Sequence, residues 1–383
     1  MILQYFFQKY QDYFSWKTKC KIVVFESDDW GTIRMPSTEA IKVLGQKNKK
    51  LYNDPYSLYD SLENSLDLES LFDVLQKHKT KNNQRPIFTF NTIVANPDFE
   101  MIRNSNFNSY HFERFTDTIS RLNSNDNVLR LWKEGVDQNF IFPQFHGREH
   151  VNVLRWLSEL RNGNKNLLEA FDWSCFSVPY FSEKNFRKNL MASLDHNGIE
   201  SDYYFQERFI NEGQALFKSI FGFNSKSFIA PAYIWDSLLH QTMYNADIRY
   251  LQGIAFQYIP SRGSNFKRVL HYNGQSLSKG LKALVRNVFF EPSLHKNLDV
   301  VGTCLKRINK LFNHNRPVII GSHRLNYIGS LNEKNRINNL NKLDELLGEI
   351  LKRWPDVLFL SSDQLGDLIS NKNIDSEYFR NAI

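Results

Sequence analysis

The sequence predicts an α/β protein built as a distorted (β/α) barrel of about seven parallel strands. Short apolar runs alternate with segments of helical periodicity along the chain, which is typical of βαβ units. The chain has 383 residues, of which 42% are hydrophobic and 14% aromatic. This is enough for one barrel with a sizeable core. We therefore expect a single domain over residues 1–383.

The predicted strands are the apolar or β-branched runs that end in polar residues. They span residues 21–29, 85–96, 140–150, 226–236, 248–256, 316–324 and 357–364. Amphipathic periodicity predicts helices between them, in residues 37–46, 68–79, 112–123, 151–163, 211–222 and 341–354. Strands that alternate with helices in this way favour a parallel sheet.

Three further segments interrupt this alternation. Residues 1–18 resemble a short amphipathic helix with Tyr, Phe and Trp on one face. Residues 45–65 are polar and rich in Asn, and residues 257–300 are expected to form a long loop or subdomain over one end of the barrel. There is no secretory leader pattern and no run of 18 apolar residues, so we expect a cytoplasmic protein without a membrane span.

The charge does not point to a nucleic-acid partner. The formal net charge is +7 and the sequence pI about 9.0, but Lys and Arg are interspersed with acids and Asn. There is no zinc-finger spacing, RNP-type strand or Gly-rich phosphate loop. The three cysteines, Cys20, Cys175 and Cys304, lie far apart, which argues against a disulfide framework or a cysteine-based zinc site. The oligomeric state is not indicated.

Titratable residues follow three of the predicted strands. Asp28 and Asp29 end the first, His146 and His150 the third, and His323 the sixth. In α/β barrels the carboxyl ends of the strands form the rim that carries the active site. Each group also has a simpler interpretation, as a capped, solvated turn or as surface histidines at a helix start.

A metal site would explain why two carboxylates stand side by side. His146 and His150 are four residues apart and can converge on one point, and a neighbouring aspartate would complete an Asp/His/His set. Three protein ligands with open positions are typical of a catalytic metal. One acid would then bind the cation, and the other would act as a base toward a metal-bound water.

The same residues resemble the polysaccharide deacetylase (NodB-homology) family. SDDWG is similar to the family's first motif, HGREH to its second, and VIIGSH to its late strand that ends in histidine. The resemblance spans residues 21–325 and implies a barrel of usually seven strands. It also implies metal-dependent removal of acetyl groups from N- or O-acetylated sugars.

Carried over by position, the resemblance assigns a role to each residue. Asp28 corresponds to the general base and His323 to the general acid, and the metal ligands are Asp29, His146 and His150. Zinc is the expected ion, although these ligands suit other divalent ions. We expect the three ligands to meet at one point, with His323 facing that point from across a cleft.

The chain departs from the family pattern at three positions, and the family's motif between the Pro motif and the final histidine is not recognisable. Trp30 precedes Gly31 in the first motif, Gly147 stands where Ser or Thr is usual, and Ile229 takes the place of an arginine that steadies the catalytic aspartate. The candidates to replace that arginine are Arg34, Arg148 and Arg324.

Substrate contacts are expected from side chains near the strand ends. The residues that we expect to bind the sugar are Trp30, Arg148, Ala232, Tyr233 and Trp235, with a backbone N–H near Ala232 stabilising an oxyanion. Asn91 and Asn96 could contact a sugar hydroxyl or close a turn. Asp363 could orient His323 or cap a helix.

Two other functions remain open on the sequence alone. One is a non-catalytic carbohydrate-binding descendant of the same fold. The other is a metal-independent glycosidase that pairs Asp28 or Asp29 with Glu149 or Glu291, although it leaves both histidines unexplained.

Overall fold

The computed structural model describes residues 10–11, 13–122, 126–178, 190–198, 200–261 and 266–371. The helix expected over residues 1–18 lies largely outside this part of the chain, although residues 10, 11, 13 and 14 are helical. None of the described helices combines the length and apolar content needed to cross a membrane.

Nine strands form one sheet in which every pair of neighbours is parallel. The order along the sheet is β10-β7-β6-β5-β2-β1-β12-β11, and β13 pairs with the start of β1. The strands are β1 (Ile22–Trp30), β2 (Phe88–Ile93), β5 (Ile141–Gly147), β6 (Ser227–Ile229), β7 (Tyr250–Gly253), β10 (Lys282–Val285), β11 (Val288–Phe289), β12 (Val318–His323) and β13 (Leu358–Phe359). The α/β fold with a parallel, barrel-like sheet is therefore confirmed.

All seven predicted runs contain strands of this sheet, but two further strands were not predicted. β10 and β11 lie within residues 257–300, which the sequence suggested was a loop or subdomain. Strands of four and two residues are too short to show a period of their own. The same segment also contains the antiparallel hairpin of β8 (Phe256–Pro260) and β9 (Phe266–Leu270).

The chain itself connects the two ends of the sheet. β10 and β11 end opposite edges of the strand order, yet only Arg286 and Asn287 separate them. The Arg286 N–H donates to the Gly253 carbonyl at 2.8 Å, and the Asn287 N–H donates to the Ile319 carbonyl at 3.0 Å. These two residues thus span the opening that the strands leave, and the barrel is closed by a crossing of the chain instead of a ladder between edge strands.

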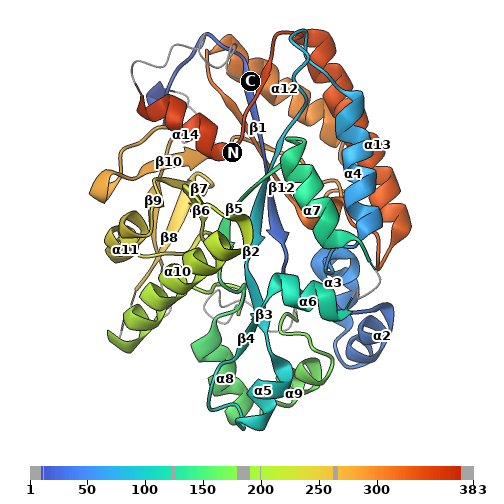
Figure 1. Cartoon of the computed structure of the whole chain (residues 1–383), viewed down its shortest axis with the longest axis vertical. Coiled ribbons are helices and arrows are strands. Elements are labelled where there is room, and N and C mark those ends of the chain that lie inside the picture. The colour runs from blue at the N-terminus through green and yellow to red at the C-terminus, as the bar shows by residue number, and fades with distance from the viewer. Residues whose placement is uncertain are drawn as a thin grey trace.

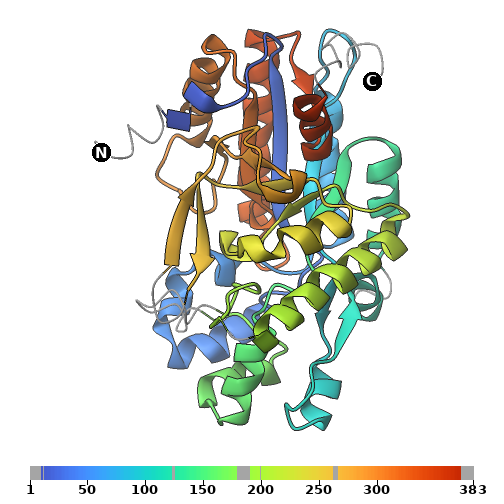
Figure 2. The ribbon, with the colours of Figure 1, turned by 90° about the vertical axis from the view of Figure 1, so that its left-hand side faces the viewer.

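Helices cover both sides of the sheet. They are α2 (Thr38–Lys47), α3 (Pro55–Tyr59), α4 (Ser65–Lys77), α5 (Phe99–Asn104), α6 (Phe115–Leu122), α7 (Val128–Asp137), α8 (Val153–Arg161), α9 (Lys165–Asp172), α10 (Glu200–Phe221), α11 (His240–Asn245), α12 (Val300–Asn313), α13 (Glu333–Arg353) and α14 (Ser362–Ser370). In Figure 1, α4, α7 and α13 lie on one side of β1 and β2, and α10 and α11 lie on the other. Figure 2 shows the long helix α10 running across the molecule in side view.

Shorter elements occupy the connections. The described 3-10 turns are η1 (Lys49–Asn53), η4 (Pro231–Tyr233), η5 (Ser237–Leu239), η6 (Ser278–Gly280) and η7 (Arg324–Asn326), and β3 (Ala95–Pro97) pairs antiparallel with β4 (Phe112–Arg114). Residues 45–65, expected as a polar excursion, contain the end of α2, η1 and α3.

Strand β1 is buried along its whole length. Its residues alternate between two cores: Val23 and Phe25 pack in one cluster, and Ile22 and Val24 in another. A central parallel strand is buried on both faces, so its sequence is a continuous apolar run and does not alternate with polar residues. The polar end of β1 therefore projects from a rigid scaffold.

Candidate active site

A backbone irregularity at the end of β1 brings both aspartates into one cavity. The pairing of β1 with β2 shifts register between Ser27 and Trp30, and Asp29 has a φ of 74°. In a regular strand, neighbouring side chains point to opposite faces. Aspartate tolerates this left-handed conformation better than most residues, and Asp28 and Asp29 both line the cavity.

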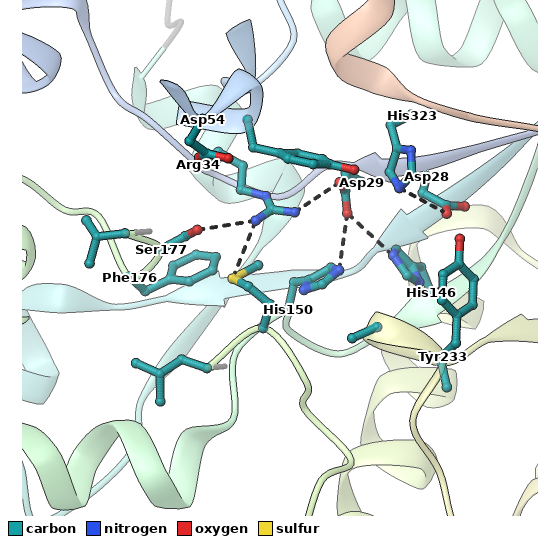
Figure 3. A pocket seen from close by; sticks show the side chains of 16 residues that line it. Asp28, Asp29, Arg34, Asp54, His146, His150, Phe176, Ser177, Tyr233 and His323 are labelled. Atoms are coloured by element: carbon teal, nitrogen blue, oxygen red, sulfur yellow. Dashed lines mark hydrogen bonds and ion pairs between the residues drawn. The ribbon is translucent and has the colours of Figure 1, made fainter. Parts of the chain in front are cut away.

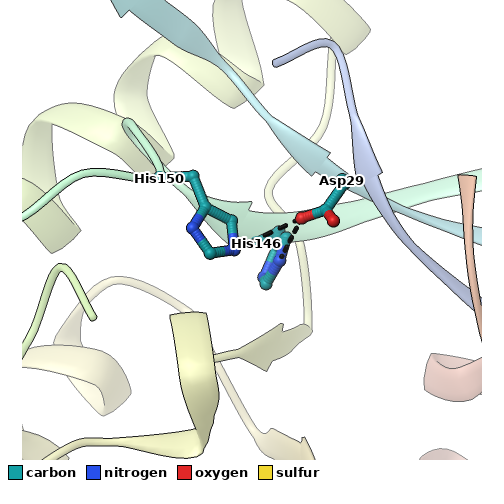
Figure 4. Close-up of side chains that lie close together, drawn as sticks. All are labelled: Asp29, His146 and His150. Atoms are coloured by element: carbon teal, nitrogen blue, oxygen red, sulfur yellow. Dashed lines mark ion pairs between the residues drawn. The ribbon is translucent and has the colours of Figure 1, made fainter. Parts of the chain in front are cut away.

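Asp29, His146 and His150 converge. His146 lies near the end of β5 and His150 in the loop before α8. The Nε2 atoms of His146 and His150 lie 3.5 and 3.2 Å from Asp29 Oδ1. One ligand atom from each of the three residues lies within 4.8 Å of the others, and all three residues are buried. Figure 4 shows the two rings directed at the same carboxylate oxygen.

The chemistry of this group fits a divalent cation. Asp29 Oδ1 is buried and has no hydrogen-bond partner, an arrangement that a bound cation would complete. The Nδ1–H of His146 donates to the Ile229 carbonyl at 2.9 Å, which leaves the Nε2 lone pair directed at Asp29. Burial, the largest cause, lowers the pKa of His150 to about 3, so its ring is neutral, as metal ligation requires.

The second oxygen of Asp29 is held by Arg34. Arg34 Nη2 lies 3.0 Å from Asp29 Oδ2. Burial alone would raise the pKa of Asp29, but Arg34 and the neighbouring histidines His150, His146 and His323 more than offset this effect and hold that pKa well below its usual range. Asp29 therefore remains a carboxylate, with one oxygen occupied and the other available.

Asp28 is fixed by Arg286, which the sequence analysis did not single out. Arg286 Nη1 and Nη2 donate to the two oxygens of Asp28 at 2.7 and 2.6 Å, and Nε donates to Glu26 at 2.7 Å. Asn91 Nδ2 donates to Asp28 Oδ1 at 2.8 Å. Burial alone would raise the pKa of Asp28, but the Arg286 guanidinium more than offsets it and keeps that pKa below its usual range.

None of the three arginines proposed as replacements for the one missing at Ile229 holds Asp28. Arg34 binds Asp29 and Asp60, and Arg324 binds Asp60 and Glu63. Arg148 pairs with Glu149 and Glu212. Arg286 makes the contact because the crossing between β10 and β11 brings it next to β1, although it is 258 residues from Asp28 in the sequence.

His323 forms a dyad with Glu291. His323 Nδ1 donates to Glu291 Oε1 at 2.6 Å, and His323 Nε2 lies 3.7 Å from Asp28 Oδ2. Burial alone would lower the pKa of His323, but the charge and hydrogen bond of Glu291, helped by Asp28 and Asp29, raise it to about 9. The imidazole is therefore protonated at neutral pH.

Glu291 fills the orienting role that we considered for Asp363. Asp363 instead lies in the first turn of α14, where it accepts a hydrogen bond from Ser361 at 2.5 Å. Ser361 is the N-cap of that helix. The second oxygen of Glu291 accepts a hydrogen bond from Asn326 Nδ2 at 2.7 Å, so both oxygens of this carboxylate are fixed.

These groups share a cavity of about 320 Å³. Figure 3 shows His146 and His150 below Asp29, with Asp28 and His323 to the right of Asp29 and above His146. The lining residues are Asp28, Asp29, Arg34, Asp54, Tyr56, His146, His150, Phe176, Ser177, Val178, Leu190, Met191, Ala230, Ala232, Tyr233 and His323. The segment 45–65 thus contributes Asp54 and Tyr56 to the site.

Two of the five residues expected to bind substrate line this cavity, and three do not. Ala232 and Tyr233 are part of its wall. Trp30 is fully buried, stacks on Phe90 at 3.7 Å and donates to Ser27, because the irregular end of β1 turns its ring into the core. Arg148 is buried against its two glutamates, and Trp235 packs in a core cluster. These three side chains therefore have packing or ion-pair roles.

Both asparagines considered for sugar binding are buried and serve the scaffold. Asn91 bridges Asp28 and Gln252, with each of these two hydrogen bonds 2.8 Å long. Asn96 accepts from the Ile33 N–H and donates to the Gly31 carbonyl, both at 2.9 Å. Asn96 thereby fixes the chain that leaves β1.

Sequence reasoning missed Arg286 and Tyr56 as functional candidates, and it considered Glu291 only as the acid of a glycosidase and not as the partner of His323. Arg286 directly follows the apolar run LKALV, as Asp28 follows its own strand, and Glu291 follows VFF. The available signal was thus a polar residue that directly follows a short apolar run. This signal was overlooked because both runs lie in residues 257–300, which were expected to form a loop or subdomain. Nothing in the local sequence marks Tyr56.

Fold and site together define an α/β barrel of parallel strands with a buried, cation-fitting Asp/His/His group at the carboxyl ends of β1 and β5. No family model and no curated protein matches the chain. Among solved structures, a probable polysaccharide deacetylase from Pseudomonas aeruginosa PAO1 is 6% identical, with 93% of this chain and 92% of that chain covered and a TM-score of 0.45.

Two other solved structures show a similar degree of likeness. An allantoinase is 8% identical, with 92% of this chain and 91% of that chain covered and a TM-score of 0.44. A 4-alpha-glucanotransferase from Thermococcus litoralis is also 8% identical, with 90% of this chain and 40% of that chain covered and a TM-score of 0.44. Likeness at this level does not identify an activity.

Proposed function

We propose that the protein is a metal-dependent hydrolase that removes an acetyl or other acyl group from an N- or O-acylated sugar. The observation that carries the proposal is the pairing of two differently held aspartates. Asp29 directs a free buried oxygen at His146 and His150, while Asp28 beside it is fixed by Arg286 and faces His323. The resemblance of SDDWG, HGREH and VIIGSH to deacetylase motifs agrees with this assignment.

Asp29, His146 and His150 would hold the cation, for which zinc is the first choice. A bound divalent ion would polarise the acyl carbonyl and lower the pKa of a water molecule. Asp28 would take the proton from the attacking water, because its low pKa keeps it ionised and the Arg286 fork sets its direction.

His323 would supply the proton to the departing group. Its raised pKa keeps it charged at neutral pH, and the hydrogen bond to Glu291 fixes which ring nitrogen faces the cavity. The leaving amine or hydroxyl of the sugar would receive this proton as the acyl carbon–heteroatom bond breaks. Ala232, at the cavity wall, would offer a backbone N–H toward the developing oxyanion.

The glycosidase alternative finds no support in the cavity. Glu149 and Glu291, its possible second carboxylates, are absent from the lining; Glu149 is paired with Arg148, and Glu291 with His323 and Asn326. The non-catalytic alternative rested on the missing arginine at Ile229, and Arg286 supplies an arginine to Asp28.

Acetate release tests the proposal. The purified protein would be stripped of metal, reloaded with Zn²⁺, Mn²⁺ or Co²⁺, and incubated with N- and O-acetylated mono- and oligosaccharides. We expect metal-dependent release of acetate that is lost in Asp29→Asn. Tight binding of these sugars without acetate release under any metal would support the carbohydrate-binding descendant, and reducing sugar without acetate would support the glycosidase.

A further inference from the structure

A second cavity, of about 340 Å³, lies between α3 and the first turns of α13. We call it the lysine cleft, after Lys296, Lys334 and Lys342 in its wall. Its other lining residues are Tyr59, Pro292, Asn332, Asn335, Asn338 and Asn339. The wall is thus made of three cations, a tyrosine, a proline and four amides.

The lysine cleft has a positively charged lining, and the acid nearest in the sequence, Glu333 in the first turn of α13, lies 3.5 Å from Arg336. No carboxylate belongs to its lining, and within the described residues none of the three lysines lies within 4.0 Å of an acid. Lys296 contacts the Tyr59 hydroxyl, and its Nζ lies 4.6 Å from the centre of that ring, which leaves its charge unneutralised. Asn332 is the N-cap of the 21-residue helix α13, so the positive end of the helix dipole adds to the field.

The lysine cleft lies on the His323 side of the active site. Tyr56 lines the active-site cavity and meets the His323 ring edge-on at 5.5 Å, while Tyr59, one turn further along α3, lines the lysine cleft. Likewise Glu291 holds His323, and the next residue, Pro292, belongs to the cleft. α3 is therefore a shared wall between the two cavities.

This position matches the leaving-group side of the proposed reaction. His323 protonates the amine or hydroxyl that stays on the sugar, so the remainder of the sugar lies toward His323 and α3. The apolar side chains Phe176, Val178 and Met191 line the cavity elsewhere, and Met191 approaches Arg34 beside Asp29. A substituent on this side of the sugar would be directed toward α3, whose Tyr59 lines the lysine cleft.

We propose that the substrate is an acylated sugar linked to a phosphate or diphosphate group, and that Lys296, Lys334 and Lys342 bind this group. Lysine ammonium groups bind phosphate as compact point charges, and three of them line this cleft. The amides add neutral hydrogen bonds. This inference rests on the proposed function for the identity of the reaction, and both nucleotide-linked and lipid-linked sugars carry the required chemistry.

Binding of inorganic pyrophosphate tests the cleft independently of turnover. The triple variant Lys296→Gln, Lys334→Gln, Lys342→Gln would be compared with a control that removes the same charge elsewhere, Lys133→Gln, Lys226→Gln, Lys352→Gln. The control lysines pair with acids on other surfaces, and Lys352 lies about 27 Å along α13 from Lys334. By calorimetry at low salt, we expect dissociation constants at least tenfold higher for the cleft variant and within twofold of wild type for the control.

The variant Asp29→Asn distinguishes pyrophosphate binding in the lysine cleft from pyrophosphate binding at the proposed metal site. Pyrophosphate could also bind a cation held by Asp29, and in that case Asp29→Asn would abolish the binding that we assign to the lysines. Retained binding in Asp29→Asn supports the cleft. Equal affinity of wild type and the cleft variant, or loss of binding in Asp29→Asn alone, would overturn the inference.

Three substrates then test the link to the reaction. They are a nucleoside-diphosphate N-acetylhexosamine, a polyprenyl-diphosphate N-acetylhexosamine and the neutral methyl glycoside of the same sugar. We expect kcat/KM to fall at least tenfold in the cleft variant for one of the two diphosphates and to change little for the methyl glycoside; the diphosphate affected identifies the source. If the methyl glycoside is the best substrate and the variant handles all three normally, the inference fails while the hydrolase stands. Cleft-dependent pyrophosphate binding without any deacylation would leave the anion site intact and refute the hydrolase.

Discussion

Arg286 is the residue whose removal tests the candidate site most directly. Arg286→Gln takes away a guanidinium that forms a two-pronged contact with Asp28 and a third hydrogen bond to Glu26, all between 2.6 and 2.7 Å. Arg286, Asp28 and Glu26 are each nearly or fully buried. Two carboxylates would then lie close together in the barrel without their cation.

These contacts determine how much stability and turnover we expect Arg286→Gln to lose. Two unit charges about 4 Å apart interact by about 4 kcal/mol at an effective dielectric constant of 20, and removal of one partner of a buried ion pair costs about 3–5 kcal/mol of stability. Asp28 would also lose its direction and its low pKa. Loss of a positioned base typically lowers turnover by a factor on the order of 10²–10⁴. We expect both effects, with metal content unchanged because Arg286 makes no contact with Asp29.

The assay combines urea unfolding, metal analysis and acetate release. Gly321→Ala is a companion variant that keeps the charge of Arg286 but disturbs its position, because a Cβ there would lie 2.6 Å from Arg286 Cδ. The guanidinium is held by Glu26 and Asp28, so the side chain cannot relieve this clash without straining those hydrogen bonds. We expect Gly321→Ala to lower turnover with a smaller loss of stability than Arg286→Gln, and Arg286→Lys to restore stability more than activity.

A specific result would refute this reasoning. If Arg286→Gln folded normally and released acetate at the wild-type rate, Asp28 would not depend on the fork, and its role as the base would fall with it. Should Arg286→Gln fail to fold, wild-type turnover in both Gly321→Ala and Arg286→Lys would lead to the same conclusion.

Three further outcomes follow from the same geometry. Glu291→Gln keeps the hydrogen bond to His323 but removes the charge that raises its pKa to about 9; because activity needs the protonated imidazole and is lost as pH rises through that pKa, the alkaline limb of the pH–rate profile should move to lower pH, and an unmoved limb would exclude His323 as the acid. Asp29→Asn should lose metal, whereas Asp28→Asn should keep it and lose turnover by a factor on the order of 10²–10⁴; equal metal loss in both would show that the roles are misassigned. Zn²⁺ at about 100 times its dissociation constant should raise the free energy of unfolding by about 2.7 kcal/mol, and Asp29→Asn should remove this gain; a gain that persists would place the ion elsewhere.

The parts of the site that could be predicted are those written in short, contiguous motifs. Asp28 and Asp29 are neighbours, and His146 and His150 are four apart, so spacing alone suggested that they act together. Their strands were equally visible because each is a distinct apolar run that ends in polar residues. The fold class followed from the alternation of such runs with helices.

The parts that could not be predicted depend on long-range contacts. Arg286 is 258 residues from Asp28, and Glu291 is 32 from His323, in a segment whose strands are too short to show a period. Trp30 illustrates the same limit: we expected it to contact the sugar, but the left-handed turn at Asp29 places its ring against Phe90. Sequence periodicity carries no information about a single irregular φ.

The crossing between β10 and β11 gives the barrel a seam, and Asp28, the proposed base, is held at that seam by Arg286. Arg286 and Asn287 join edges that no strand ladder unites, and the Arg286 side chain ties the seam to β1 through Asp28. Asp29, by contrast, is held by a different arginine, Arg34. Under the proposed mechanism, opening of this crossing would release Asp28, the proposed base, and leave the proposed metal ligands in place. Closure of the barrel would then be a requirement for turnover that is separate from metal binding.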